Sequence, residues 1–269
     1  MPQWIAAAAW PEIDEIVGMP YFSESVVLAQ QKCEQVGECR QDEVIMIELA
    51  RRLGLPHAEE ELHDIYDRQL APIGMSYKEL VAHGPVTIPM TYRKYEQKGF
   101  ATPTGKIELY STRLEELGYD PLPYYEEPAI SPVSTPETAK RFPYILSTGT
   151  RIPVYFNSEH RQLPSLRRAR QDPQVEIHPD TAARHGIARG DWVRISTPHG
   201  SIRQRAHLSE DILPAVIDCQ FGWWFPEREG WEHGIWDSNS NVLTSQAGPF
   251  DPAMGSYQLR ALLCSIEKA

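Results

Sequence analysis

The sequence predicts a mixed α/β part followed by a mainly β domain that closes into a barrel. Up to about residue 120, apolar residues recur at helical spacing, whereas short alternating runs and turns dominate from about residue 142. Several short strands accompanied by one small helix favour a closed barrel, because closure removes exposed strand edges.

Helices are expected in the first part of the chain. Asp42 is expected to cap a helix that ends at Gly54. Its buried face would comprise Val44, Ile45, Leu49 and Leu53. A second helical face would comprise Leu62, Ile65, Tyr66 and Leu70. Ser76 and Glu79 form a capping box for a further short helix, which Gly84 terminates.

The connection between the two parts is rich in proline. The run 106–110 alternates like a strand, and Ser111 opens a short helix that ends at Gly118. Five prolines then punctuate a stretch without periodicity: Pro121, Pro123, Pro128, Pro132 and Pro136. We therefore predict a domain over 1–120, a linker over 121–141 and a second domain over 142–269.

The second part changes to the period of β-strands. Residues 179–185 are expected to form a short helix closed by Gly186. Strands are expected at 144–147, 175–177, 192–195, 202–208, 215–218 and 260–266.

Charge and hydropathy exclude some classes of function. The net charge is −11, and no block of consecutive lysines or arginines stands out beyond Arg167-Arg168, whereas a nucleic-acid binder needs a basic face to displace counterions. The apolar run 5–10 near the start is far too short to span a bilayer. We therefore expect neither nucleic-acid partners nor membrane insertion, while the compartment, cytoplasmic or periplasmic, stays open.

No catalytic or metal-ligating residue is predicted. The phosphate-loop, dinucleotide-loop, zinc-protease and nucleophile-elbow motifs are all missing from the sequence. None of the four cysteines forms a Cys-x-x-Cys pair, and the nine histidines are scattered. We expect this polypeptide alone to bind no metal tightly.

Two local features invite a second interpretation. In the run 147–151, a strand ends at Gly149, which allows a ligand to approach the backbone closely. Arg151 follows and can bind a phosphate. The alternative interpretation of this run is an ordinary turn between a strand and a loop. The run 221–226, with Trp231 and Trp236 nearby, is unusually aromatic. Such a cluster is typical of a core or interface, or of a wall facing a cofactor.

Several runs, taken in order, resemble the C-terminal portion of molybdopterin oxidoreductases of the bis-pterin (dimethyl sulfoxide reductase) family. These runs are 102–110, 144–151, 157–162, 175–182 and 240–244. The sequence departs from the family pattern at Thr150, which is inserted where many members run Thr-Gly-Arg, and at Asn157, where many members have histidine.

The resemblance implies a double-psi β-barrel from about residue 142, preceded by part of the family's α/β body. In that family the barrel closes over bis(molybdopterin guanine dinucleotide) carrying Mo or W. The resemblance places six residues of this sequence at cofactor contacts: Thr148, Gly149, Arg151, Asn157, Ser158 and Asn241.

The resemblance also implies what this chain lacks. The metal ligand and any iron–sulfur cluster would belong to a missing N-terminal part of the same chain, and electron-transfer subunits would be further partners. The complete enzyme would be an oxidoreductase, whereas this chain alone would be inactive and retain no cofactor. The alternative is a stand-alone barrel that serves as a binding or interaction module. Substrate, and the choice of Mo or W, stay open.

Overall fold

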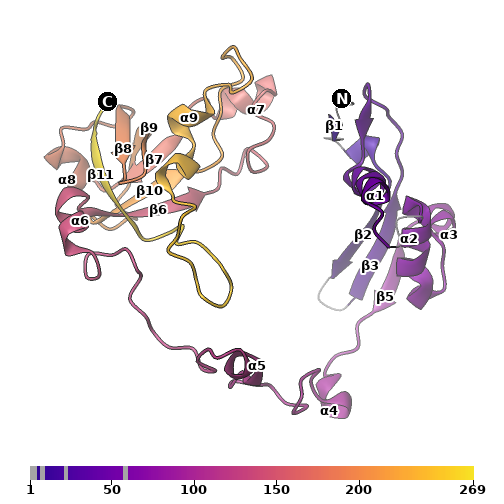
Figure 1. Cartoon of the computed structure of the whole chain (residues 1–269). Helices are drawn as coiled ribbons and strands as arrows, with labels where there is room; N and C mark the ends of the chain where they lie inside the picture. Colours follow the sequence, from indigo (N-terminus) through magenta and orange to yellow (C-terminus); the bar gives the residue numbers. More distant parts are fainter. Residues whose placement is uncertain (1–4, 7–9, 21–23, 57–59) are drawn as a thin grey trace. The chain divides into compact units, whose positions relative to one another are not determined.

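The computed structural model describes residues 5–6, 10–20, 24–56 and 60–269 (Figure 1). The chain forms two compact units, Met1–Glu108 and Leu109–Ala269. The domain limits predicted at 120 and 142 stay a prediction. The predicted linker carries one short helix, α6 (Pro136–Arg141), which begins with a proline.

The first unit is built on a small antiparallel sheet. Its strands are β2 (Glu15–Pro20), β3 (Glu24–Gln30) and β5 (Val86–Pro89), in the order β2-β3-β5. A separate two-residue parallel pair joins β1 (Ile5–Ala6) to β4 (Cys39–Arg40). The unit also has short 3₁₀ turns at Trp10–Glu12 and Ala71–Ile73.

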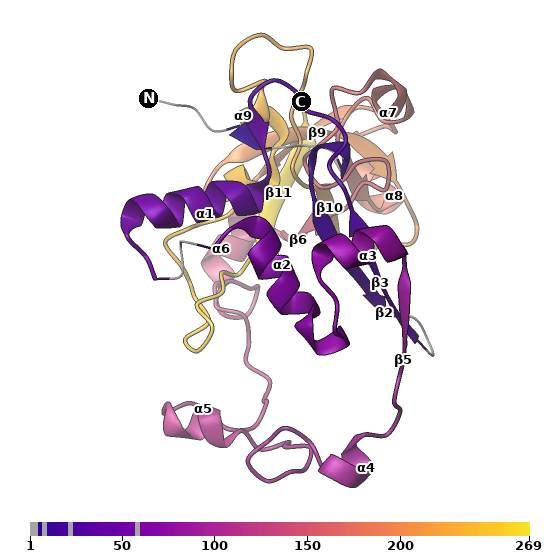
Figure 2. The same ribbon diagram turned by 90° about the vertical axis from the view of Figure 1, so that its right-hand side faces the viewer.

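Two helices cover one face of this sheet (Figure 2). They are α2 (Leu62–Leu70) and α3 (Tyr77–His83). Their inward residues form the core of the unit: Leu62, Tyr66, Leu70, Tyr77 and Leu80. The predicted second helical face is therefore confirmed, with Ile65 at its half-buried margin.

The first predicted helix exists, but its details differ. Helix α1 (Asp42–Leu53) ends at Gly54, whose φ of 65° is the left-handed conformation that glycine adopts readily. Gln41, not Asp42, is the N-cap residue. The predicted burial is wrong, since no residue of α1 is buried and Leu53 is 64% exposed. Val44 and Ile47 are half-buried and pack against the core of the unit, whereas Leu49 and Leu53 of the predicted face stay exposed.

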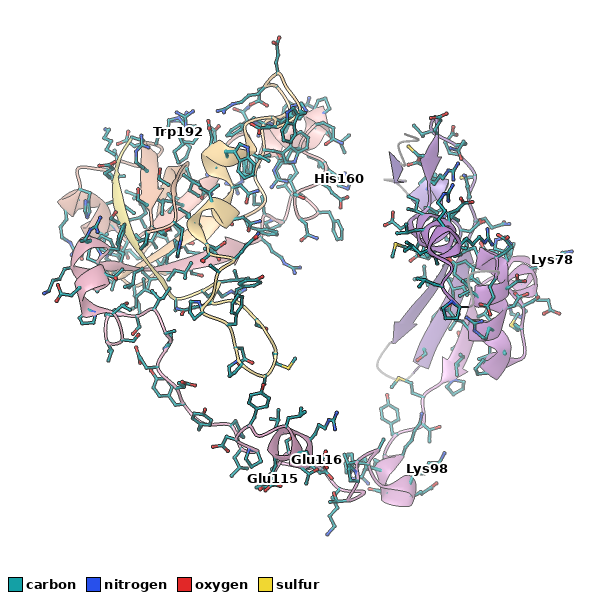
Figure 3. All side chains as sticks on the ribbon, viewed as in Figure 1. Lys78, Lys98, Glu115, Glu116, His160 and Trp192 are labelled. Carbon is teal, nitrogen blue, oxygen red and sulfur yellow. The ribbon has the colours of Figure 1, made fainter. Side chains whose placement is uncertain are left out.

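The predicted capping box of α3 is confirmed. The Glu79 backbone N–H donates to Ser76 Oγ at 3.2 Å, and the Ser76 N–H donates to Glu79 Oε2 at 2.8 Å. We expect Ser76→Ala to lower the free energy of unfolding of this unit by about 1 kcal/mol, because one helical N–H loses its acceptor. Denaturant titration measures the change. Lys78→Ala is the control on the same helix, because Lys78 is exposed and points away from the unit (Figure 3). If Lys78→Ala lowered the free energy of unfolding as much as Ser76→Ala, the capping role of Ser76 would be contradicted.

The strand predicted at 106–110 is wrong. This stretch is irregular, with Leu109 82% exposed, because an alternating pattern makes a strand only where another strand offers hydrogen bonds. It lies between α4 (Tyr95–Lys98) and α5 (Thr112–Glu116). The predicted start of α5 is confirmed, because Ser111 Oγ accepts from the Leu114 N–H at 3.2 Å.

The second unit is a closed six-stranded barrel, with the strand order β10-β6-β11-β8-β9-β7. Two of its strand pairs, β6 with β10 and β7 with β9, are parallel, and the others are antiparallel. The strands are β6 (Tyr144–Thr150), β7 (Gln174–Ile177), β8 (Trp192–Ser196), β9 (Ser201–Leu208), β10 (Val216–Gln220) and β11 (Leu262–Lys268). The predicted double-psi β-barrel is confirmed.

Alternating residues fill the inside of the barrel. Leu146, Val175, Ile195 and Ile217 have no exposed surface, and their sequence neighbours face outward. Short helices lie outside the barrel: α7 (Pro164–Ala169), α8 (Pro179–Arg184), α9 (Ile235–Ser238) and the 3₁₀ turn η3 (Ser240–Leu243). The predicted helix at 179–185 is confirmed as α8.

Candidate functional site

The end of strand β6 leaves an open backbone position. The Thr148 hydroxyl is buried and donates to the Leu259 carbonyl. Gly149 has a φ of 94°, and no atom lies within 4 Å of the place where a Cβ would stand. The inserted Thr150 donates to Asp218 Oδ2 on the neighbouring strand β10. The backbone is therefore fixed on both sides of Gly149 while its own face stays accessible.

Arg151 follows immediately and is exposed. Among the described residues, its side chain has neither a hydrogen bond nor an ion pair. An exposed guanidinium beside an accessible glycine backbone can bind an oxyanion in a bidentate manner.

A buried arginine holds the next loop. Arg161 has no exposed surface, and its guanidinium lies 4.7 Å from the ring centres of both Tyr155 and Trp223. Its Nη1 donates to the Asn157 carbonyl at 3.1 Å. Asn157 has a φ of 51°, a left-handed conformation that asparagine tolerates better than most residues. The arginine therefore fixes the backbone that presents Asn157.

The guanidinium of Arg161 is only partly satisfied. Its Nε and Nη2 atoms are buried and have no hydrogen-bond partner in the described part of the chain. Burial lowers the pKa of Arg161 to about 10, so the side chain still carries its charge at neutral pH. The aromatic rings of Tyr155 and Trp223 stabilise the buried charge through cation–π contacts.

The loop is also tied to the segment that follows β10. The Trp224 indole N–H donates to the Ser158 carbonyl. A Cβ on Gly222 would lie 3.3 Å from the Ser158 Cβ, so the two backbones approach closely here. The side chains of Asn157 and Ser158 remain exposed. Five of the six predicted contact residues thus share the end of β6 and its following loop.

Asn241 lies on a different turn. It belongs to η3, which is held to the β8–β9 turn because Thr197 Oγ1 donates to the Leu243 carbonyl at 2.9 Å. Its side chain is exposed. No hydrogen bond among the described residues joins Asn241 to the loop that carries the other five.

The aromatic run divides between core and surface. Trp223 and Phe225 are buried and form a small cluster with Ile152 and Tyr155. Trp231, in contrast, is 83% exposed. The core interpretation of the run is therefore correct for the buried pair.

Asp218 is a site residue that sequence reasoning missed. It lies on β10 between Ile217 and Cys219, whose side chains fill the barrel, so it points outward beside Thr150. Burial raises the pKa of Asp218, and the hydrogen bonds from Thr150 and Ser147 offset this only in part. Its Oδ1 atom has no partner among the described residues. Only the outward position in the alternation could have indicated it.

The raised pKa makes a prediction for Asp218→Asn. A carboxyl whose pKa is raised by folding stabilises the fold below its ordinary range and loses that contribution as pH rises through the folded pKa. We expect the variant to be more stable than the parent at neutral pH, and the difference to vanish in acid. Melting temperatures measured across pH test this. Asp211→Asn, at an exposed carboxyl, is the control, and an identical pH profile for parent and Asp218→Asn would contradict the assignment.

The described residues hold no evident metal centre. They contain no group of three or more His, Cys, Asp or Glu side chains that could bind a metal ion. Burial raises the pKa of the Cys219 and Cys264 thiols, which keeps both protonated. No helix among the described residues is long and apolar enough to cross a membrane.

Comparisons with known proteins agree with this geometry. Residues 144–262 match the family "Molydopterin dinucleotide binding domain". Acetylene hydratase of Syntrophotalea acetylenica is 34% identical over 90% of this chain and 34% of its own length. Dopamine dehydroxylase of Eggerthella lenta is 43% identical over 64% of this chain and 17% of its own length.

Two further relatives extend the match. Dimethyl sulfoxide/trimethylamine N-oxide reductase of Rhodobacter capsulatus is 27% identical over 96% of this chain and 34% of its own length. The structure of acetylene hydratase from Pelobacter acetylenicus matches 98% of this chain and 38% of that chain, with 31% identity and a TM-score of 0.81. The chain thus spans about a third of the length of these relatives. It belongs to the dimethyl sulfoxide reductase family of molybdopterin oxidoreductases and carries that family's dinucleotide-binding barrel.

Proposed function

We propose that this chain is the cofactor-binding portion of a longer Mo- or W-dependent oxidoreductase. In this proposal, the end of β6 and its following loop contact the guanine dinucleotide of a bis-pterin cofactor. The observation that carries it is the open backbone at Gly149, with an unpaired Arg151 beside it, inside the segment that matches the dinucleotide-binding family. That the chain spans about a third of its relatives supports a longer complete protein.

The residues present fit such a group. The face of Gly149 is free of protein atoms, which permits close approach by a pyrophosphate to the backbone N–H groups. Arg151 offers a positive charge that no carboxylate of the described residues neutralises. Asn157 and Ser158 offer exposed polar side chains on a loop that Arg161 holds in place.

The chain's own residues would bind and orient the cofactor. When bound, the metal and its pterins supply two-electron redox chemistry, which no side chain can perform. Thr148 has its hydroxyl proton committed to Leu259, so it would offer oxygen lone pairs rather than a donor. Asn241, on its separate turn, would reach the cofactor independently of the β6 loop. The metal ligand, any iron–sulfur cluster and the electron-transfer partners would come from outside this chain.

The substrate is not part of the proposal. The names of the relatives denote hydration, dehydroxylation and reduction, so relatives of this chain are named for different reactions. This diversity is what a shared cofactor-binding barrel allows, because one fold can serve different reactions.

The isolated chain is predicted to hold no metal. We expect elemental analysis of the purified 269-residue polypeptide to show no stoichiometric Mo, W, Fe or Zn, because the described residues offer no clustered ligand set. A polypeptide of the same sequence that had been loaded with zinc and then dialysed is the control for weak binding. A stoichiometric metal signal in the untreated protein would overturn the prediction.

The proposal itself is tested on the gene. We expect the reading frame to continue upstream of Met1 and to encode a metal-ligand motif. The longer product should copurify with Mo or W and release guanosine monophosphate on acid treatment. A genuine start at Met1, with neither metal nor nucleotide in the product, would instead support a stand-alone barrel module.

A further inference from the structure

A cavity on the barrel unit, lined by none of the six predicted contact residues, gathers positive charge. It has a volume of about 470 Å³ and lies between the end of α7, the start of β7, the turn that precedes β8 and the strand β9. Four arginines and a histidine line it against a single carboxylate: Arg168, Arg170, Arg189, Arg205, His207 and Asp172. In a chain with a net charge of −11, so many arginines around one hollow indicate an anion site.

Two of these arginines are held rigidly. Arg205 pairs with Asp172 at 3.2 Å, donates to the Gly190 carbonyl at 3.0 Å and stacks over Trp192 at 4.3 Å. Arg189 donates to the Leu208 carbonyl at 2.6 Å. The one carboxylate is therefore already neutralised by Arg205, while the charge of Arg189 has only neutral acceptors.

The other two arginines have donor atoms without an acceptor. Arg168 is exposed, and its side chain has no hydrogen bond or ion pair within the part of the chain that the structure describes. Arg170 donates to the Gln174 side chain, but its buried Nε has no partner among the described residues. A buried donor without a partner costs free energy. A ligand oxygen that accepted a hydrogen bond from Arg170 Nε would remove this cost.

We propose that this cavity binds a small phosphate-bearing anion. Planar guanidinium forks match phosphate oxygens, and three arginines without a carboxylate partner suit a group with more than one negative charge. A volume of about 470 Å³ accommodates a small molecule. None of the six predicted dinucleotide contacts lines the cavity, so the inference goes beyond the proposed function and does not depend on it.

The cavity and the β6 loop have no residue in common, although the Tyr155 hydroxyl of the loop donates to the carbonyl of Arg170, which lines the cavity, at 2.6 Å. Trp192, which lies under Arg205 at the β9 side of the cavity, and His160, in the loop that follows β6, lie apart in Figure 3. Arg168 and Arg189 have no hydrogen bond to the β6 loop among the described residues, so they can be substituted without changing a predicted dinucleotide contact.

Calorimetric titration of the 269-residue chain with inorganic pyrophosphate and, separately, with GDP tests the proposal. Both probes are expected to bind, and each of Arg168→Gln and Arg189→Gln should weaken binding by about tenfold or more, the loss of one charge-assisted hydrogen bond. Arg194→Gln is the matched control, because Arg194 is exposed on β8, pairs with Glu267 and does not line the cavity. Arg168→Gln should leave the melting temperature unchanged, since the side chain has no partner to lose.

The outcomes are distinct. Suppose that the cavity variants weaken the binding of both pyrophosphate and GDP. Equal affinity for the two probes would then assign the site to a free anion, whereas tighter binding of GDP would assign it to a nucleotide. Absence of binding by either probe would overturn the proposal, as would unchanged affinity in Arg168→Gln and Arg189→Gln. If Gly149→Val weakened pyrophosphate binding while the cavity variants did not, the anion would belong to the β6 loop. That result would refute the cavity proposal and would leave the proposed function of the chain unaffected.

Discussion

Trp223→Ala is expected to lower the free energy of unfolding of the barrel unit by about 3–5 kcal/mol, the cost of deleting a buried aromatic side chain. Trp223 has no exposed surface. Its ring packs edge-on against Tyr155, with ring centres 5.9 Å apart, and lies under the guanidinium of Arg161. The substitution would leave a cavity and would also remove one of the two aromatic faces that stabilise a buried charge.

Chemical denaturation followed by far-ultraviolet circular dichroism measures the loss. Trp231→Ala is the matched control, because Trp231 is 83% exposed and its removal should change stability by no more than about 0.5 kcal/mol. A loss for Trp223→Ala as small as that of the control would mean that this cluster does not anchor the loop after β6.

Gly149→Val is expected to remove most of the bound dinucleotide from the complete enzyme. The valine side chain would fill the space that is open at Gly149, and a β-branched residue at a φ of 94° would strain the backbone. Arg151→Ala should weaken the cofactor contact by about 1.5–3 kcal/mol, the worth of a hydrogen bond to a charged group. Nucleotide released on acid treatment, measured per mole of protein, reports both effects.

A second glycine variant controls for the backbone strain that valine would introduce at Gly149. Gly118 also has a positive φ, 82°, with no atom near its Cβ position, and it lies far along the sequence from the β6 loop. Gly118→Val therefore introduces comparable backbone strain without filling the proposed site. Full nucleotide content in Gly149→Val, or an equal loss in Gly118→Val, would mean that Gly149 forms only a turn.

The barrel was predictable because its strands alternate. Val175 and Ile177, or Val193 and Ile195, point to the same interior, and both of these runs form strands in the structure. The sheet of the first unit was not predictable in this way. Strand β3 contains the unbroken apolar run 26–29, which does not distinguish a strand from a buried helix.

The exceptions have a common physical cause. The run 106–110 alternates without a partner strand, and the predicted face of α1 is covered only in part, since Val44 packs against the core while Leu53 stays exposed. The local sequence pattern indicates how often apolar side chains recur along the chain, but it does not indicate which other part of the fold packs against them. Helix ends, by contrast, depend on local residues, which is why Gly54 and the Ser76–Glu79 box were placed correctly.

The candidate site depends on contacts between residues distant in sequence. Arg161 and Trp223 meet only through the fold, as do Thr150 and Asp218. Sequence spacing alone left the run 147–151 undecided between a turn and a phosphate clamp, and the family resemblance supplied the six contact residues. Their role in binding stays a prediction.

Hydrogen exchange on the complete protein, with and without its cofactor, tests the central claim most directly. We expect backbone amides in residues 148–158 to exchange more slowly when the cofactor is bound, because the dinucleotide would cover this loop and accept hydrogen bonds from it. Residues 112–118, around α5, serve as the internal reference and should not change. Equal exchange in residues 148–158 with and without cofactor would contradict the account, whatever protection is found elsewhere in the barrel.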